Sequence, residues 1–384
     1  MLKDFSESGP NVVWEVERGS GHASPTVSGD YLVFIHELDG LEMIECLHPE
    51  SGKRYWKHEY AVTLGSSYGV ADAPRAAPTI AGDFVYSMGA LGDLICFDLA
   101  TGAVVWQRNM EDSFGAAPLF FGRGGSPLVY GDTLVVNAGG NACIVGLDKR
   151  TGEKKWETPH DWHASYASPV PASLNGMDRV LVFAGGMLNP PAGGLISVDP
   201  VDGSIRSATP WRATQFASVN AASPVVAGDS VFITEGYTEG GALVDFSPGG
   251  EASIRWTAPR FRGQFTTPIA HDGYLYGVSG TAGTEIVCYE LESGREMWRD
   301  SVDMGDARLG RASALWADGA FLCIGDQGTL LWLDLAPSGI RIISQAQLFH
   351  APETWGVPAL SRGLLYVNRN AMGSRLICYD LRAD

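Results

Sequence analysis

The sequence predicts an all-β protein, an eight-bladed β-propeller whose blades are four-stranded antiparallel sheets. The first observation is a repeated phrase in which a glycine follows an aspartate by four residues and a tryptophan follows it by eight. Its clearest copies are Asp98-Gly102-Trp106 and Asp148-Gly152-Trp156, and the other tryptophans assigned to this position are Trp14, Trp56, Trp256 and Trp298. The second observation is the period, because Trp56, Trp106 and Trp156 are 50 residues apart. A fixed period of this size indicates stacked supersecondary units.

One repeat contains four short apolar runs separated by turns. The runs are residues 77–80, 84–88, 94–97 and 103–107. They are rich in β-branched and aromatic residues, with glycine and aspartate between them, which is typical of antiparallel strands. The aspartate can accept hydrogen bonds from turn amides, the glycine tolerates a positive φ, and the tryptophan is expected to pack between neighbouring sheets. Four strands in about 40–50 residues predict one propeller blade.

The same pattern along the chain predicts eight blades. Their expected ranges are 20–62, 74–110, 124–159, 164–210, 219–258, 263–302, 309–346 and 354–384. Two blades lack the tryptophan: Ser207 is expected at its position in blade four and Ile342 in blade seven. Blade five keeps Trp256 behind a longer turn.

The last predicted blade lacks an outer strand, because the chain ends at 380–384, where that strand is due. Residues 10–18 contain Trp14 and have the pattern of the missing strand. We therefore predict that this segment closes the ring by completing blade eight, which removes the unpaired strand edges that invite aggregation. Residues 1–384 are expected to form one domain and a monomer.

Charge and cysteine usage narrow the classes of function. The chain has 27 basic and 44 acidic residues, a net charge of −17, which argues against nucleic acid or an anionic membrane surface as partner. Cys46, Cys96, Cys288 and Cys378 occupy one equivalent position in different blades, too far apart for disulfides. We expect the cysteines to be packing residues, and no motif predicts a zinc or redox site.

The segments between predicted strands sort onto two faces, because strand direction alternates within a blade. One face carries short turns of fixed form. The other carries long, irregular segments, namely the connections between second and third strands and the links between blades. Variable loops on a rigid scaffold are where binding usually occurs, so we expect a site on the irregular face.

Candidate residues for binding lie on that irregular face. Before blade two they are Tyr68, Asp72 and Arg75, and in the segment His160-Asp161-Trp162-His163 they are Asp161, Trp162 and His163. Arg262 and Arg311 lie in two basic links, and Glu235, Asp326, Asn368 and Arg369 end second strands near the channel mouth. Structural ion pairs, ordinary loop packing and hydration of the mouth are the alternatives. The His-x-x-His spacing lacks a helix and a third ligand, so no metal is expected.

Residues 95–106, preceded by Ala77-Pro78-Thr79 and Gly82-Asp83, resemble the pyrroloquinoline-quinone-type propeller repeat. The size and blade count are similar to those of stand-alone propellers related to the outer-membrane assembly lipoprotein BamB. This resemblance implies that the protein acts by binding partners and resides in the periplasm or another extracytoplasmic compartment. No signal peptide or bilayer-spanning run is visible, so the sequence itself leaves the compartment open.

Quinoprotein dehydrogenases share this repeat but need adjacent cysteines, calcium ligands and a catalytic aspartate in long insertions. Because the chain has no adjacent cysteines, we expect no cofactor, with the quinone and calcium as the less favoured case. Nucleophile-elbow, phosphate-loop and zinc-protease motifs are also absent. The predicted function is a non-catalytic scaffold that holds a protein segment or a small polar or carbohydrate ligand. The alternative is a quinone-dependent or carbohydrate-active enzyme that uses the central funnel.

Overall fold

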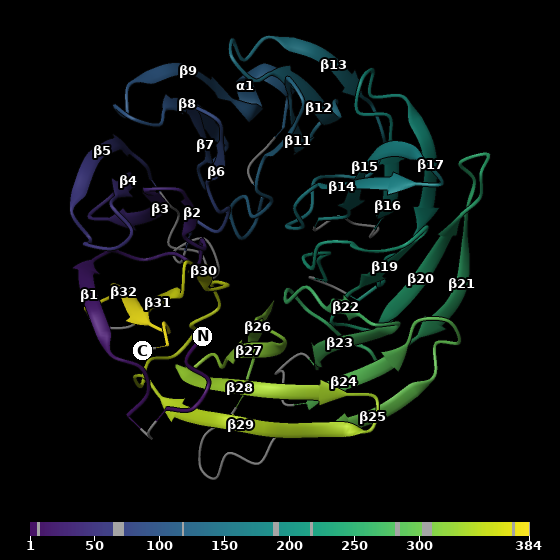
Figure 1. Ribbon diagram of the computed structural model, residues 1–384. Coiled ribbons are helices and arrows are strands. Elements are labelled where there is room, and N and C mark those ends of the chain that lie inside the picture. Colours follow the sequence, from purple (N-terminus) through teal and green to yellow (C-terminus); the bar gives the residue numbers. More distant parts are fainter. Residues whose placement is uncertain are drawn as a thin grey trace.

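Eight four-stranded antiparallel sheets form a closed ring around a central axis (Figure 1). The computed structural model describes residues 1–5, 8–63, 73–116, 119–186, 192–215, 218–280, 285–301, 309–370 and 373–383. In each sheet the strands run in chain order from the axis outward, except in the last blade. The predicted eight-bladed all-β propeller is confirmed.

The strands of the first four blades follow the predicted repeat. Blade one contains β2 (Thr26–Ser28), β3 (Tyr31–Leu38), β4 (Leu41–Leu47) and β5 (Arg54–Ala61), and blade two contains β6 (Thr79–Ala81), β7 (Phe84–Met88), β8 (Asp93–Asp98) and β9 (Val104–Asn109). Blade three contains β10 (Leu128–Tyr130), β11 (Thr133–Gly139), β12 (Cys143–Asp148) and β13 (Lys154–Thr158), and blade four contains β14 (Val170–Leu174), β15 (Met177–Ala184), β16 (Gly194–Val198) and β17 (Ile205–Pro210). A short helix, α1 (Met110–Phe114), follows β9.

The remaining blades complete the ring. Blade five contains β18 (Val225–Ala227), β19 (Ser230–Thr234), β20 (Gly241–Phe246) and β21 (Ala252–Ala258), and blade six contains β22 (Ile269–His271), β23 (Tyr274–Ser279), β24 (Glu285–Glu290) and β25 (Glu296–Asp300). Blade seven contains β26 (Ser313–Ala317), β27 (Ala320–Ile324), β28 (Thr329–Ala336) and β29 (Gly339–Gln347), and blade eight contains β30 (Ala359–Ser361), β31 (Leu364–Arg369), β32 (Arg375–Asp380) and β1 (Val12–Glu17).

The first strand of the chain closes the ring, as predicted. β1 pairs antiparallel with β32, and Trp14 lies opposite Cys378. Figure 1 shows the purple β1 beside the yellow β32, with the C-terminus at this blade, while the Met1 amino group reaches Asp318 of blade seven at 2.7 Å. The closing strand carries the indole that blades one, two, three, five and six carry on their own fourth strand.

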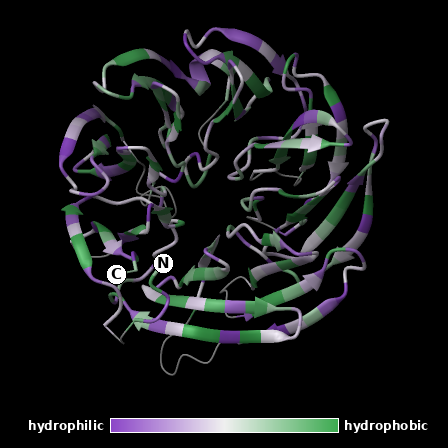
Figure 2. Cartoon of the chain, in the orientation of Figure 1, coloured by the Kyte–Doolittle hydropathy of each residue, from purple (hydrophilic) through white to green (hydrophobic). Residues whose placement is uncertain are grey.

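The hydrophobic core is divided among the spaces between neighbouring blades. Second and third strands are covered on both faces, and β11 is buried along its whole length. Between blades two and three, Tyr86 and Leu94 pack in one cluster with Val136 and Leu147. Outer strands such as β29 mix apolar and polar residues (Figure 2). Because each sheet buries its faces only against its neighbours, stability is shared around the ring.

In the blades that carry it, the repeated tryptophan joins the blade to the next one. The Trp56 Nε1–H donates to the Leu99 carbonyl of blade two at 2.8 Å, and Trp106 Nε1–H donates to the Lys149 carbonyl of blade three at 3.1 Å. The indole of Trp56 also covers Gly102, where an added Cβ would lie 2.5 Å from the ring. In the same turn, Asp98 Oδ1 accepts hydrogen bonds from the N–H and Oγ1–H of Thr101 at 2.8 and 2.7 Å. The Asp–Gly–Trp motif therefore forms the interface between neighbouring blades.

Blade seven differs from the prediction. Its expected tryptophan position was Ile342, but β28 and β29 pair so that Ser344 lies opposite Trp332, as Trp106 lies opposite Cys96. The spacing of eight residues after the aspartate does not hold here, because these two strands continue to pair as far as Ala336 and Gly339. The hairpin is therefore two residues longer than that of blade two. The indole is instead on β28, where Trp332 Nε1–H donates to the Leu2 carbonyl at 3.1 Å.

The cysteines are packing residues, as expected. All six are buried and free. Burial raises the pKa of the Cys46 and Cys96 thiols to about 12, so both remain neutral thiols. In the part of the chain that the structure describes, no helix has the length and hydropathy of a membrane-crossing helix.

Candidate binding site at the channel mouth

The links between blades meet at one end of the central channel, on the irregular face. Each link reaches its inner strand through a four-residue segment that ends in proline in seven of eight cases, as in His22-Ala23-Ser24-Pro25 and Tyr166-Ala167-Ser168-Pro169. We call the large first residues of these segments the mouth ring: His22, Arg75, Tyr166, Phe265, Arg311 and Trp355. His22 is buried, the other five are half-buried, and Gly124 and Ala221 occupy the two remaining positions.

The arrangement of one sector shows that the ring lies near the axis. The rings of Phe265, before blade six, and Trp355, before blade eight, lie 5.4 Å apart. Arg311 comes from the intervening link, and its guanidinium lies 5.7 Å from the Phe265 centroid and 5.1 Å from the Trp355 centroid. Links that skip one blade can touch only where the blades converge. The guanidinium therefore lies within cation–π distance of both aromatic rings.

The rest of the ring is also anchored. Trp355 stacks on His22 with centroids 4.7 Å apart. On the far side, Arg75 Nε–H donates to the Phe121 carbonyl at 2.9 Å, and the Phe121 ring lies 5.7 Å from that of Tyr166. The ring is therefore a nearly continuous belt of aromatic and guanidinium groups.

The electrostatics of the mouth are positive around His22. Burial and then the charges of Arg75 and Arg18 lower the pKa of His22 to about 3, so its imidazole is neutral at physiological pH. Arg18 is 3% exposed and donates to Asn370 Oδ1 at 2.7 Å and to the Gly21 carbonyl at 2.8 Å. Burial lowers the pKa of Arg18 to about 10, which still leaves it charged.

The opposite end of the channel is acidic. The turns between inner and second strands there carry exposed aspartates, namely Asp30, Asp83, Asp132, Asp229, Asp272 and Asp318. In the eighth blade the turn carries Arg362, which lies 3.1 Å from Asp30. Asp132 pairs with Lys149, and Asp318 pairs with Lys3 and the Met1 amino group, so the unpaired negative charge at this end comes from Asp83, Asp229 and Asp272 among the described residues. A difference in charge between the two ends can orient an approaching charged partner.

The residues predicted for the site fall into different environments. Tyr68 and Asp72 lie outside the described residues. Arg75 and Arg311 belong to the mouth ring, and Asp326 Oδ2 accepts from the Arg311 backbone N–H at 3.3 Å. Arg262 is exposed, and its Nε–H donates to the Pro259 carbonyl at 3.2 Å.

The segment 160–163 packs as an ordinary loop. The Trp162 carbonyl accepts a hydrogen bond from Cys143 Sγ–H at 3.1 Å. The Trp162 indole packs on the hydrophobic cluster between blades three and four. Asp161 and His163 are exposed. Within the described ranges, no group of three or more His, Cys, Asp or Glu side chains could hold a metal ion.

Two strand-end residues expected to line the funnel are buried instead. Glu235 is fully buried and accepts hydrogen bonds from the N–H groups of Tyr237 at 2.8 Å and Gly240 at 2.8 Å, so it closes its own loop. Asn368 is 3% exposed and donates to the Ala23 carbonyl at 2.8 Å. Arg369 bonds to the Gly373 carbonyl at 3.0 Å. These three side chains support loops, because strand ends in a closed ring face neighbouring blades as well as the channel.

The prediction missed four of the six mouth-ring residues, His22, Tyr166, Phe265 and Trp355. The signal was present in the four-residue segments, whose last three positions are small residues and proline in most copies, while the first is a large residue in six of the eight. A variable large residue at a fixed position of a repeat indicates a surface that the fold itself does not require.

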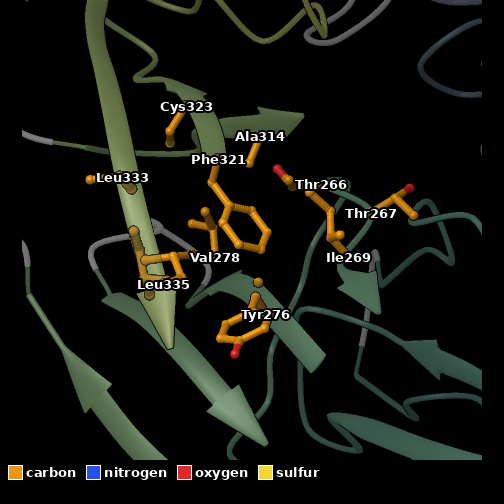
Figure 3. A pocket seen from close by; sticks show the side chains of 12 residues that line it. Thr266, Thr267, Ile269, Tyr276, Val278, Ala314, Phe321, Cys323, Leu333 and Leu335 are labelled. Atoms are coloured by element: carbon orange, nitrogen blue, oxygen red, sulfur yellow. The ribbon is translucent and has the colours of Figure 1, made fainter. Parts of the chain in front are cut away.

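One internal cavity lies between blades six and seven and is lined mainly by apolar residues (Figure 3). It has a volume of about 20 Å³, and Phe321 points into it beside Val278. This volume suits one water molecule at most. The cavity is a packing defect between sheets, and the mouth remains the candidate site.

Comparison with known proteins places the chain among related propellers. The family profile described as outer membrane protein assembly factor BamB matches residues 40–300. The BamB of Bordetella pertussis (strain Tohama I) is 23% identical over 341 residues, which cover 87% of this chain and 68% of that protein. A polyvinylalcohol dehydrogenase of Pseudomonas sp is 27% identical over 211 residues, covering 50% of this chain but only 30% of that enzyme.

Solved structures show the same fold at low identity. BamB from Moraxella catarrhalis has a TM-score of 0.63 at 16% identity and covers 97% of this chain and 98% of that one. A europium-containing methanol dehydrogenase has a TM-score of 0.67 at 14% identity, with 95% and 85% covered. The profile match extends over more than half of the chain, from blade one into blade six. The protein therefore belongs to the family of the outer membrane protein assembly factor BamB, which is built from pyrroloquinoline-quinone-type propeller repeats.

Proposed function

We propose that this protein is a non-catalytic scaffold that holds an extended polypeptide segment at the mouth ring. The observation that supports this most directly is the composition of the ring, which presents tryptophan, tyrosine, phenylalanine and arginine side chains, most of them half-buried, around one opening. Tryptophan, tyrosine and arginine are the residues that dominate binding energy at protein interfaces. The family relation points the same way and supports an extracytoplasmic location as part of the proposal.

The rigidity of the mouth favours binding. The Ser126 N–H donates to Ser168 Oγ at 3.0 Å, the Ser168 N–H to Ser223 Oγ at 3.2 Å, and the Ser223 N–H to Thr267 Oγ1 at 3.1 Å. These hydrogen bonds run from blade to blade just below the ring. A surface that is ordered before the partner arrives loses less conformational entropy on binding.

The test uses two partly exposed tryptophans at opposite ends of the channel. A random peptide library displayed on phage is panned against the purified protein, and enriched peptides are measured by fluorescence anisotropy. Trp355→Ala and Tyr166→Ala should each weaken binding about tenfold or more, because truncating an interface anchor costs at least about 2 kcal/mol.

The matched control is Trp316→Ala. Trp316 is 40% exposed and lies at the acidic end of the channel, so its loss should leave peptide affinity unchanged. Enriched peptides that bind all three variants equally, or a library that yields no binder, would contradict the proposal. If sugars bind at the mouth ring and library peptides do not, a small polar or carbohydrate ligand is favoured instead.

A quinone-dependent dehydrogenase is the second candidate, favoured by the polyvinylalcohol dehydrogenase match. The mouth does not fit that cofactor set. Calcium prefers several oxygen ligands, whereas the mouth offers mainly guanidinium, imidazole and indole groups, with the Tyr166 hydroxyl and the Asp326 carboxylate as its oxygen donors. Among the described residues no cluster of three carboxylate, histidine or cysteine side chains could hold a metal ion, and the six cysteines are all buried and free. No reaction step is therefore assigned to a quinone. Addition of pyrroloquinoline quinone with calcium should leave the melting temperature unchanged; a concentration-dependent rise with dye reduction would favour the enzyme.

A further inference from the structure

We infer that the sector of the mouth ring around Arg311 is a subsite for a carboxylate group carried by the bound polypeptide. The inference rests on the proposed function and adds the chemistry that the partner must offer. That chemistry is a carboxylate, either the α-carboxylate of a chain end or an Asp or Glu side chain, next to an apolar group.

Two of the three guanidinium nitrogens of Arg311 have no acceptor among the described residues. Its Nε–H donates to Gln264 Oε1 at 3.1 Å, and its guanidinium lies 5.7 and 5.1 Å from the ring centroids of Phe265 and Trp355. Among the described residues, Nη1 and Nη2 have no acceptor, and no carboxylate oxygen lies within 4.0 Å of the guanidinium. By contrast, Arg255, Arg299 and Arg341 pair with carboxylates at 2.6–3.1 Å. A guanidinium with two parallel free N–H groups matches the bidentate geometry of a carboxylate.

Two buried ring nitrogens, one on Trp355 and one on the His22 ring stacked against it, also lack partners in the part of the chain that the structure describes. Asn370 donates from Nδ2 to the Glu353 carbonyl at 2.8 Å and accepts at Oδ1 from Arg18, which fixes the orientation of its amide. The same Nδ2 lies 3.1 Å from His22 Nδ1. Neither His22 Nε2 nor Trp355 Nε1, on the two stacked rings, has a partner in the described chain. An unpaired buried donor is costly, and an incoming oxygen would remove that cost.

One group opposes an anion in this sector. Asp326 Oδ2 accepts from the Arg311 backbone N–H, and its Oδ1 is buried without a partner among the described residues. Burial raises the pKa of this carboxyl group, while Arg311 acts against that rise. A ligand carboxylate beside Arg311 would be repelled by Asp326. The inference therefore predicts opposite effects for Arg311 and Asp326 substitutions, which a merely structural role would not produce.

The aromatic walls define what accompanies the carboxylate. Phe265 and Trp355 are half-buried and tilted by 48°, which leaves apolar surface beside the guanidinium. An aromatic or aliphatic neighbour on the ligand would cover that surface and exclude water from the ion pair, which strengthens it.

The experiment follows Trp355 by ¹⁹F NMR in the full chain labelled with 5-fluorotryptophan, with the resonance assigned through its loss in Trp355→Phe. The probes are N-acetyl-phenylalanine, its amide, and N-acetyl-glutamate α-amide. We expect the acid to shift the Trp355 resonance saturably and its amide to bind about tenfold more weakly, as the loss of a charge-assisted pair requires. N-acetyl-glutamate α-amide shows whether a side-chain carboxylate also serves.

Variants separate the subsite from the scaffold. Arg311→Gln should abolish the preference for acid over amide, Arg311→Lys should keep part of it, and Asp326→Asn should strengthen binding of the acid. Arg262→Gln, an exposed arginine on a neighbouring link, is the control and should change nothing. Equal binding of acid and amide in the wild type, or a preference that survives Arg311→Gln, would overturn the inference.

The two proposals fail differently. Library peptides that need Trp355 and Tyr166 but show no carboxylate preference would leave the scaffold function intact and reject the subsite. Probes and peptides that both leave the Trp355 resonance unmoved would reject both proposals.

Discussion

Gly102 shows at the scale of one residue why the repeated phrase has its form. Its φ is +72°, in the region that favours glycine, and the Trp56 indole lies against the space that a side chain would occupy. The turn therefore needs glycine for two separate reasons, conformation and contact. The tryptophan eight residues after each aspartate belongs to the same device in the neighbouring blade.

These two reasons can be separated by a matched pair of substitutions. Gly82 also has a positive φ, +60°, but no atom lies within 4 Å of its added Cβ. Gly82→Ala should cost about 1 kcal/mol of unfolding free energy for the backbone alone. Gly102→Ala should cost about 2–4 kcal/mol, because overpacking against Trp56 is added. Urea unfolding measures both, and equal costs would show that the indole contact contributes nothing.

At the scale of the element, β1 links the two ends of the chain. It supplies the outer strand of blade eight, and its Trp14 Nε1–H donates to the Pro49 carbonyl of blade one at 2.8 Å. The same indole covers Gly52. One strand therefore both completes a sheet and docks it on the next, which makes the ring continuous across the point where the chain begins and ends.

Substitutions within β1 test this double role. Trp14→Ala should lower the free energy of unfolding by about 2–4 kcal/mol, since it removes a large packed side chain and a hydrogen bond across the closure. Val12 lies on the same strand and is 54% exposed, so Val12→Ala should change stability by less than about 0.5 kcal/mol. Similar losses in the two variants would show that the closure depends on strand pairing rather than on the indole.

At the scale of the whole molecule, the net charge hides an asymmetry. The chain carries −17 overall, yet Arg18, Arg75 and Arg311 lie near the mouth while the aspartate turns lie at the other end of the channel. An acidic partner would be attracted by the arginines at the mouth but repelled by the net charge of the whole chain.

Association kinetics distinguish the two cases. If the mouth steers the partner, an acidic peptide from the enriched library should associate several-fold faster as ionic strength falls from about 0.15 M toward 0.01 M, where screening lengths grow to about 30 Å. Stopped-flow fluorescence measures this rate. Slower association at low salt would show that the overall negative charge governs the encounter and would remove the electrostatic support for the mouth as the binding end.

The sequence by itself determined the architecture. The phrase around Asp98 and Asp148, its period and the spare strand around Trp14 were sufficient for blade number, strand order and closure, because each blade obeys the same local rules and buries its faces against its neighbours. Where a local rule varied, the prediction failed: the hairpin of blade seven is longer, so Ser344 and not Ile342 takes the tryptophan position. The extent of the domain and the monomeric state stay predictions.

Only the tertiary structure decided the candidate site. Phe265, Arg311 and Trp355 are about 45 residues apart along the chain, and nothing in their local sequence indicates that a guanidinium lies over two rings. Glu235 and Asn368 were equally polar candidates, and closure of the ring buried both. The physical reason is that strands form from local periodicity, whereas a channel mouth exists only where eight separate links converge on one axis.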